Sequence, residues 1–284
     1  MNFLQNQPFE GSRKRVLYTD LLWEPEAAPK KVVVFCHGYN GFKDWGPWHA
    51  VGQYFAQRGF LFVKFNFSHN GVTPEDFTAF GDLEAFAENN LTTELDDLGC
   101  LFDSLETFEV DGTPTLDREL CLIGHSRGGA IATLRAGEDD RVKRLCTWAG
   151  VSNYEDRFLL GNALVKWKEE GVYYLRNGRT GQQMPHNFQY YLDFRNNQER
   201  LDIKEACYRL TCPHLVFHGA SDEAVHLTEA MRLHKWSRGS ELVILDDTGH
   251  TFGGRHPWHA DTLPEALKEV CQRTSDFFYK RKAR

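Results

Sequence analysis

The sequence lacks any apolar run long enough to span a membrane, and it lacks a secretion signal at its start. Residues 1–8 read MNFLQNQP, in which no charged start is followed by an apolar segment. An excess of basic residues is also missing: 40 Asp and Glu residues outnumber 33 Lys and Arg residues, for a formal net charge of −7. Because nucleic-acid binders normally present a basic face, we expect a cytoplasmic protein with no nucleic-acid partner and no membrane partner.

Paired cysteine motifs are absent as well. The seven cysteines are an odd number, none forms a C-x-x-C pair, and several lie inside apolar runs. This usage is typical of reduced, buried thiols and argues against a disulfide framework or a zinc site. Twelve histidines are present, but the HPWH segment at residues 256–259 lacks a recognised metal-binding spacing. We therefore expect no metal and no cofactor.

What the sequence does contain is a G-x-S-x-G motif between a strand-like run and a helix-like segment. Residues 119–129 read ELCLIGHSRGG, with Ser126 at the centre of the motif. A serine on a tight strand-to-helix turn needs small residues two positions before and after it, and Gly124 and Gly128 occupy those positions. The helix expected at about residues 127–136 would direct its positive dipole end toward the reacting centre. The pattern predicts Ser126 as a catalytic nucleophile, with an ordinary glycine turn as the alternative.

Two further strand-like runs supply an acid and a base, in the chain order expected after such a serine. Residues 213–219 precede a loop that carries Asp222, and residues 241–246 precede a loop that carries His250. A hydroxyl is a weak nucleophile, so we predict His250 as the general base and Asp222 as the carboxylate that orients it. The alternatives are a helix cap for Asp222, before residues 225–236, and a surface position for His250. Substitute candidates are Glu223, Asp246 and Asp247 for the acid, and His256 and His259 for the base.

A fourth motif is the glycine-containing turn CHGYNG at residues 36–41, which follows the apolar run 31–35. The four segments 37–41, 124–129, 219–222 and 249–252, taken in this order, resemble the motifs of the α/β-hydrolase superfamily. Within it they resemble the branch of dienelactone-hydrolase-like proteins and feruloyl-esterase-like carboxylesterases, from about Arg13 to the C-terminus. Dienelactone hydrolases proper use a cysteine nucleophile, whereas this chain carries Ser126, which favours ordinary ester hydrolysis over lactone chemistry.

The resemblance implies an α/β fold with a mainly parallel central sheet, helices on both faces and a helical cap insertion. The alternation of helix-like and strand-like segments along the chain is consistent with this class. The resemblance also implies an oxyanion hole made by the backbone N–H groups of Arg127, directly after the nucleophile, and of Tyr39 in the glycine-containing turn. An ordinary glycine turn is again the alternative for residues 36–41.

A single domain is expected over residues 1–284, with one long interruption at about residues 151–211. We interpret this segment as a helical cap or lid. Its aromatic residues either line a substrate pocket or anchor the cap to the body; they are Trp167, Tyr173, Tyr174, Phe188, Tyr190, Tyr191 and Phe194. Its basic residues Lys166, Arg176 and Arg179 either favour an acidic substrate group or are simply solvated. Near the N-terminus, residues 13–23 are expected to form a hairpin or strand pair and residues 25–29 a loop.

These features predict a serine esterase that cleaves carboxylic esters through a Ser126–His250–Asp222 acyl-enzyme mechanism. The expected partner is a small-molecule ester or thioester, and a homodimer is left open. Thioesterase or aminoacyl-peptidase activity on the same machinery is the near alternative. A ligand-binding protein that keeps the fold without turnover is the alternative from another class, because fold alone does not fix function.

Overall fold

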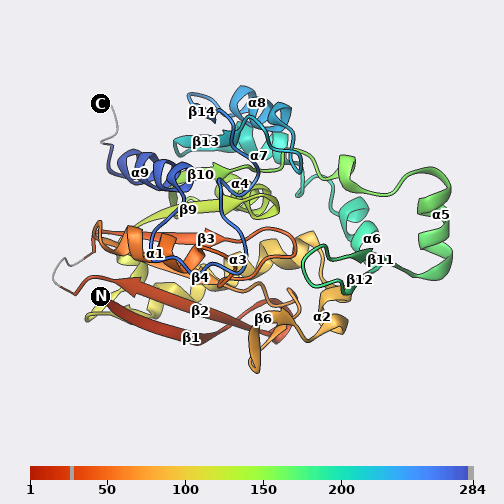
Figure 1. Cartoon of the computed structure of the whole chain (residues 1–284), viewed down its shortest axis with the longest axis horizontal. Helices are drawn as coiled ribbons and strands as arrows, with labels where there is room; N and C mark the ends of the chain where they lie inside the picture. Colours follow the sequence, from red (N-terminus) through yellow and green to blue (C-terminus); the bar gives the residue numbers. More distant parts are fainter. Residues whose placement is uncertain (26–28, 281–284) are drawn as a thin grey trace.

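A computed structural model describes residues 1–25 and 29–280. Residues 26–28, inside the loop expected at 25–29, and residues 281–284 lie outside the described residues. The main sheet contains, in spatial order, β1 (Asn2–Glu10), β2 (Val16–Trp23), β4 (Phe60–Phe65), β3 (Lys31–Cys36), β9 (Glu119–His125), β10 (Val142–Trp148), β13 (His214–Gly219) and β14 (Glu241–Leu245). The pairs β1–β2 and β2–β4 are antiparallel and the other neighbours are parallel, so the predicted mainly parallel sheet is confirmed (Figure 1).

The helices of the described chain are α1 (Trp48–Ala56), α2 (Leu83–Glu88), α3 (Leu91–Thr107), α4 (Arg127–Glu138), α5 (Gly161–Glu170), α6 (Gln189–Asn196), α7 (Ile203–Arg209), α8 (Leu227–Trp236) and α9 (Glu265–Tyr279). Three small hairpins pair β5 (Val72–Thr73) with β6 (Asp76–Phe80), β7 (Glu109–Val110) with β8 (Thr113–Pro114), and β11 (Val172–Arg176) with β12 (Gln183–Asn187). None of these helices is both long enough and apolar enough to cross a bilayer.

The helices cover both faces of the main sheet. In β3, Val32 and Val34 belong to a buried cluster with residues of α3, α4, α7 and α8. The intervening Val33 and Phe35 belong to a second cluster with residues of α1 and α9. A strand buried on both faces cannot alternate apolar with polar residues, which explains why the central strands read as continuous apolar runs.

The N-terminal strand pair is longer than the sequence predicted. The prediction of a hairpin within residues 13–23 was wrong in its bounds, because β1 already begins at Asn2. The edge position of β1 explains the weak signal: its side chains alternate between half-buried and exposed, and Pro8 interrupts the apolar pattern. A register shift between Leu4 and Gln7, with Asn6 at φ 54°, breaks the alternation further.

The expected cap at residues 151–211 contains α5, β11, β12, α6 and α7, so it is a mixed segment and not purely helical as predicted. The hairpin forms because the β-branched and aromatic run at residues 172–174 favours a strand. In Figure 1, α5 extends away from the main sheet and the β11–β12 hairpin turns back toward α2. That this segment acts as a lid stays a prediction.

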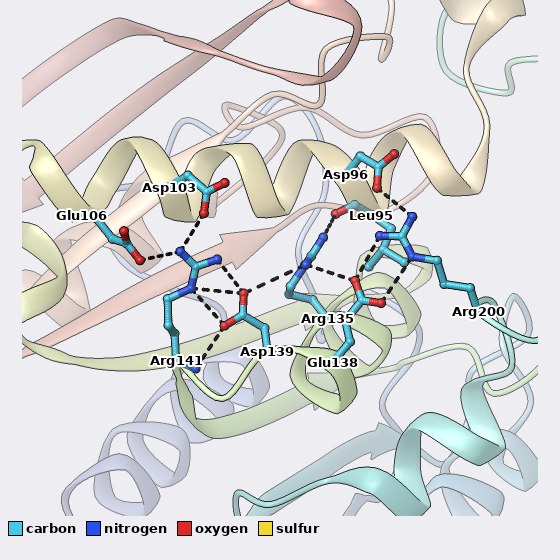
Figure 2. Close-up of polar contacts among 9 residues, drawn as sticks. All are labelled: Leu95, Asp96, Asp103, Glu106, Arg135, Glu138, Asp139, Arg141 and Arg200. Carbon is cyan, nitrogen blue, oxygen red and sulfur yellow. Dashed lines mark hydrogen bonds and ion pairs between the residues drawn. The ribbon is translucent and has the colours of Figure 1, made fainter.

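A network of charged side chains joins the outer ends of α3 and α4 and reaches the cap segment (Figure 2). Arg141 Nη1 lies 2.7 Å from Asp103 Oδ1 and 2.6 Å from Glu106 Oε1, both on α3. Arg200, which follows α6, places its Nη1 2.8 Å from Asp96 Oδ1. Because these groups are partly exposed, each pair contributes about 0–1 kcal/mol. We interpret the Arg200 pairs as connecting the cap segment to α3 and α4.

The turn between β9 and α4 is unusually tight. Ser126 has φ 57° and ψ −123°, a conformation that L-residues rarely adopt. A Cβ built on Gly124 would lie 2.3 Å from Gly128 O, and one built on Gly128 would lie 2.4 Å from His37 O. The two glycines are therefore required by the close approach of three backbone segments.

We predict that Gly124→Ala and Gly128→Ala each lower the free energy of unfolding by about 3 kcal/mol or more, the upper end for overpacking, because the added methyl meets backbone atoms that cannot rotate away. Gly178→Ala is the matched control. No atom lies within 4 Å of its added Cβ, so its effect should stay within about 0.5 kcal/mol. Urea unfolding measures all three. Equal stability of Gly128→Ala and the wild type would contradict the steric account.

Candidate active site

Ser126 lies at the C-terminal end of β9, where its backbone is fixed on both sides. Its N–H donates to Trp148 O at 2.9 Å, and its carbonyl accepts from Gly129 N at 2.9 Å and from Val151 N at 3.2 Å. Ser126 and His250 both line a cavity of about 430 Å³. The structure thus brings the predicted nucleophile and the predicted base to one cavity at the carboxyl ends of the parallel strands, where ligands bind in open α/β sheets.

His250 and Asp222 are in direct contact. His250 Nδ1 lies 2.8 Å from Asp222 Oδ2, and Asp222 Oδ1 accepts from the N–H groups of Ala224 and Val225, each at 2.9 Å. Burial by itself would raise the pKa of Asp222, but the hydrogen bond from His250 and these backbone bonds hold that pKa below its usual value. The carboxylate therefore stays ionised and fixes the proton of His250 on Nδ1, which leaves Nε2 as a base.

The substitute residues do not occupy equivalent positions. Glu223, Asp246 and Asp247 are exposed, as is His259. His256 lines the cavity, but its Nδ1 accepts from Gly46 N at 2.9 Å. The helix-cap alternative for Asp222 fails in detail, because α8 begins at Leu227 and has His226 as its N-cap.

Within the described part of the chain, no hydrogen bond joins Ser126 Oγ to His250. Catalytic hydrogen bonds are often long in unliganded enzymes and shorten when substrate binds, so this geometry does not exclude proton transfer between the two side chains.

His125 is a positioning residue that the sequence reasoning missed. Its Nε2 donates to the backbone carbonyl of His250 at 3.0 Å, and the two imidazole rings are 4.8 Å apart. Burial, followed by the nearby His250, lowers the pKa of His125 to about 3, so His125 stays neutral. Its place inside the G-x-S-x-G motif was the available signal, but a contact across 125 residues cannot be read from spacing.

The glycine-containing turn predicted to form an oxyanion loop lies directly against Ser126. A Cβ built on Gly38 would be 2.9 Å from Ser126 Cβ, and Asn40 adopts a left-handed φ of 53°. Tyr39 lines the same cavity as Ser126, whereas Arg127 follows Ser126 as the first residue of α4 and does not line the cavity. The positions of both residues are compatible with the predicted oxyanion hole, and the role of their N–H groups stays a prediction.

The Arg127 side chain connects this turn to α3 and to the cap segment. Its guanidinium pairs with Glu94 and lies 4.9 Å from the ring centroid of Tyr39. Burial alone would lower the pKa of Arg127, but Glu94 raises it above the usual value. The Tyr39 hydroxyl lies 2.8 Å from His186 Nε2 on β12, and burial lowers the pKa of His186 to about 3, so this hydrogen bond joins two neutral groups.

A buried charge cluster fixes the segment that continues the glycine-containing turn. Lys43 Nζ lies 2.9 Å from Asp20 Oδ2, and Lys64 Nζ lies 2.8 Å from the same oxygen; all three side chains are fully buried. Asp44 pairs with both lysines, and Lys43 N donates to Asn66 Oδ1 at 2.7 Å. Removal of one partner would leave an uncompensated buried charge, so the cluster anchors the loop to β2 and β4.

The cavity is lined by residues from four parts of the chain, at positions 38–48, 125–126, 177–179 and 250–256. Trp45 and Trp48 supply apolar walls, and Asn177, Arg179 and Arg255 supply polar groups. None of the seven aromatic residues that the sequence singled out in the cap segment lines it. Instead Trp167 packs against Tyr173 and Phe188 within the cap segment. Phe194 belongs to the buried cluster that contains residues of β3, α3 and α4, and Tyr190 packs against that cluster, which favours the anchoring interpretation for these two residues. No group of three or more His, Cys, Asp or Glu side chains in the described chain is arranged to hold a metal ion.

Known proteins share both the sequence pattern and the fold. A monoacylglycerol lipase of Mycolicibacterium smegmatis is 30% identical over 117 residues, 41% of this chain, and the match spans 35% of the lipase. The structure of Est1E from Butyrivibrio proteoclasticus matches with a TM-score of 0.70 at 16% identity, covering 97% of this chain and 98% of that one. The esterase domain of a Rhodothermus marinus protein matches with a TM-score of 0.65 at 19% identity, covering 98% of each chain. At these identities the two structures show a common fold alone.

The family model described as the alpha/beta hydrolase family matches residues 33–266, from β3 to the start of α9. This range contains all four motifs and the cavity that Ser126 shares with His250. The chain therefore belongs to the alpha/beta hydrolase family.

Proposed function

We propose that this protein hydrolyses carboxylic esters through a covalent acyl-enzyme on Ser126. The observation that carries the proposal is the hydrogen-bonded Asp222–His250 couple, whose imidazole lines one cavity with a serine in a left-handed turn. The M. smegmatis relative, named a monoacylglycerol lipase, supports an ester over other acyl substrates.

In the first half of the proposed reaction, Ser126 Oγ attacks the ester carbonyl while His250 Nε2 takes its proton. The carbonyl oxygen becomes an oxyanion, which the N–H groups of Tyr39 and Arg127 stabilise. Collapse of this intermediate breaks the ester bond, and the alcohol leaves with the proton from His250. Ser126 then carries the acyl group.

In the second half, water attacks the acyl-enzyme and His250 takes one of its protons. The second tetrahedral intermediate releases the carboxylic acid, and the proton returns from His250 to Ser126 Oγ. Throughout, Asp222 stabilises the imidazolium and keeps its ring oriented. The strained turn adds no step of its own; it presents Oγ above the strand ends, clear of the sheet.

Thioesterase and aminoacyl-peptidase activities use the same machinery and differ only in the leaving group, so a substrate panel separates them. The cytoplasmic location and the single domain stay predictions. A homodimer stays an open alternative.

Replacement of Ser126 by Ala should lower kcat/KM for p-nitrophenyl butyrate by about 10⁴-fold or more, because the attacking atom is lost. His250→Ala should cause a comparable loss, since the two groups act as a unit. Ser221→Ala, an exposed serine on the Asp222 loop, is the matched control and should retain activity. A ligand-binding protein without turnover predicts no difference among these variants, and undiminished hydrolysis by Ser126→Ala would refute the proposal.

Asp222→Asn should lower kcat by about 10³- to 10⁴-fold at pH 7, because an amide N–H facing His250 Nδ1 would shift the imidazole proton to Nε2.

The pKa of Asp222 is depressed in the folded protein, so its contribution to stability is present above the unfolded value of about 3.9 and is lost as pH falls further. Unfolding curves of the variant and the wild type should therefore converge below about pH 4. Glu223→Gln, an exposed neighbour, is the control and should change neither quantity. Full activity in Asp222→Asn would exclude the orienting role.

A further inference from the structure

One wall of the candidate active-site cavity is cationic and has no acidic counterpart. Arg179, in the turn between β11 and β12, and Arg255, in the loop that also carries His250, both line the cavity. None of the lining residues is Asp or Glu. Neither arginine forms an ion pair within the described part of the chain. This contrasts with the net charge of −7 of the chain, which would repel anions from most of its surface.

Arg179 is held in place by aromatic rings. Its guanidinium carbon lies 5.4 Å from the ring centroid of Phe42 and 5.9 Å from that of Phe80. Burial lowers the pKa of Arg179, yet an arginine remains protonated at physiological pH. His256 lines the same wall, and burial together with the Arg179 charge lowers its pKa. His256 Nδ1 accepts from Gly46 N, so the proton of the neutral ring is on Nε2 as a further donor.

Asn177 lines the cavity beside Arg179 and fixes the turn that carries it. Its side chain is 4% exposed and lines the cavity. Its Oδ1 accepts from Arg179 N at 2.9 Å and from Thr180 N at 3.2 Å, which fixes the orientation of the amide. Nδ2 is then a buried donor without a partner.

We propose that Arg179, Arg255 and Asn177 form a subsite for an anionic oxygen-bearing group of the substrate, a carboxylate or a phosphate. We name these three residues the anion subsite. The inference rests on the proposed esterase function and specifies its substrate class: esters with a negatively charged group away from the scissile carbonyl. A guanidinium donates several N–H groups in a plane that matches both kinds of anion, and the Asn177 side chain accepts from the N–H groups of Arg179 and Thr180, which holds the turn that carries Arg179.

Three matched esters test the proposal: p-nitrophenyl valerate, glutarate and 4-phosphonobutyrate, which differ only in a terminal methyl, carboxylate or phosphonate. After subtraction of the enzyme-free rate, kcat/KM of the wild type should be about 10- to 100-fold higher for at least one anionic ester than for the valerate, because hydrogen bonds to charged groups are the strong ones. A higher rate with the glutarate ester indicates a carboxylate substrate, and a higher rate with the phosphonobutyrate ester indicates a phosphate substrate. The preference should weaken as salt is added.

Arg179→Gln should remove most of the preference for the anionic ester. Arg176→Gln is the matched control: Arg176 lies on the same hairpin, is exposed and does not line the cavity, so both rates should be unchanged. Asn177→Asp is a second test that preserves the fold, because its carboxylate still accepts the two backbone bonds but replaces the free donor by a negative charge. It should reverse the preference in favour of the valerate. Equal rates for all three esters in the wild type and both variants would overturn the inference.

A binding measurement separates this inference from the proposed function. Monomethyl glutarate and methyl valerate are titrated into the Ser126→Ala variant, with tryptophan fluorescence as the signal because Trp45 and Trp48 line the cavity. Tighter binding of monomethyl glutarate, lost in Ser126→Ala/Arg179→Gln, supports the anion subsite even if the wild type hydrolyses no ester. Hydrolysis of the valerate ester that disappears in Ser126→Ala, together with equal binding of the two ligands, supports the esterase and refutes the subsite.

Discussion

The close contact between the start of α4 and the loop after β3 fixes the position of the candidate nucleophile, around which the rest of the site is arranged. A Cβ at Gly128 would lie 2.4 Å from His37 O, so the first turn of α4 rests directly on the backbone of that loop. Ser126 is thereby forced into a left-handed φ and set beside Gly38. The strain is offset by the two buried clusters that hold β9 from both faces of the sheet.

Hydrogen bonds and buried ion pairs hold the other residues of the site in place around Ser126. His125 binds the carbonyl of His250, and Asp222 binds its ring, so both the backbone and the imidazole of the base are held. On the opposite side, Lys43 and its buried partners anchor the segment that follows the glycine-containing turn. The cap segment meets this core through Tyr39 and His186, which places the Arg179 turn at the cavity.

The sheet and the three candidate catalytic residues could be predicted because each residue follows an apolar run. The runs before Ser126 and Asp222 are the buried strands β9 and β13, and the run before His250 is the edge strand β14, which is still apolar at residues 242–245. The strand β1 was missed because polar residues and Pro8 interrupt its sequence, and the β11–β12 hairpin because β12 reads QMPHN and contains no apolar run. The contact of His125 with His250 and the unpartnered Asn177 amide depend on loops that are far apart in the sequence. Spacing along the chain carries no information about them.

The most direct test of the account is the reaction of the folded wild-type protein with a fluorophosphonate, followed by mass analysis of the intact chain and of its peptides. Such probes react with a serine only where a base and an oxyanion site activate it. The account predicts one equivalent of label, carried by the peptide that contains Ser126. Absence of label in well-folded protein, or label on another serine, would contradict the claim that the glycine-held turn presents an activated nucleophile.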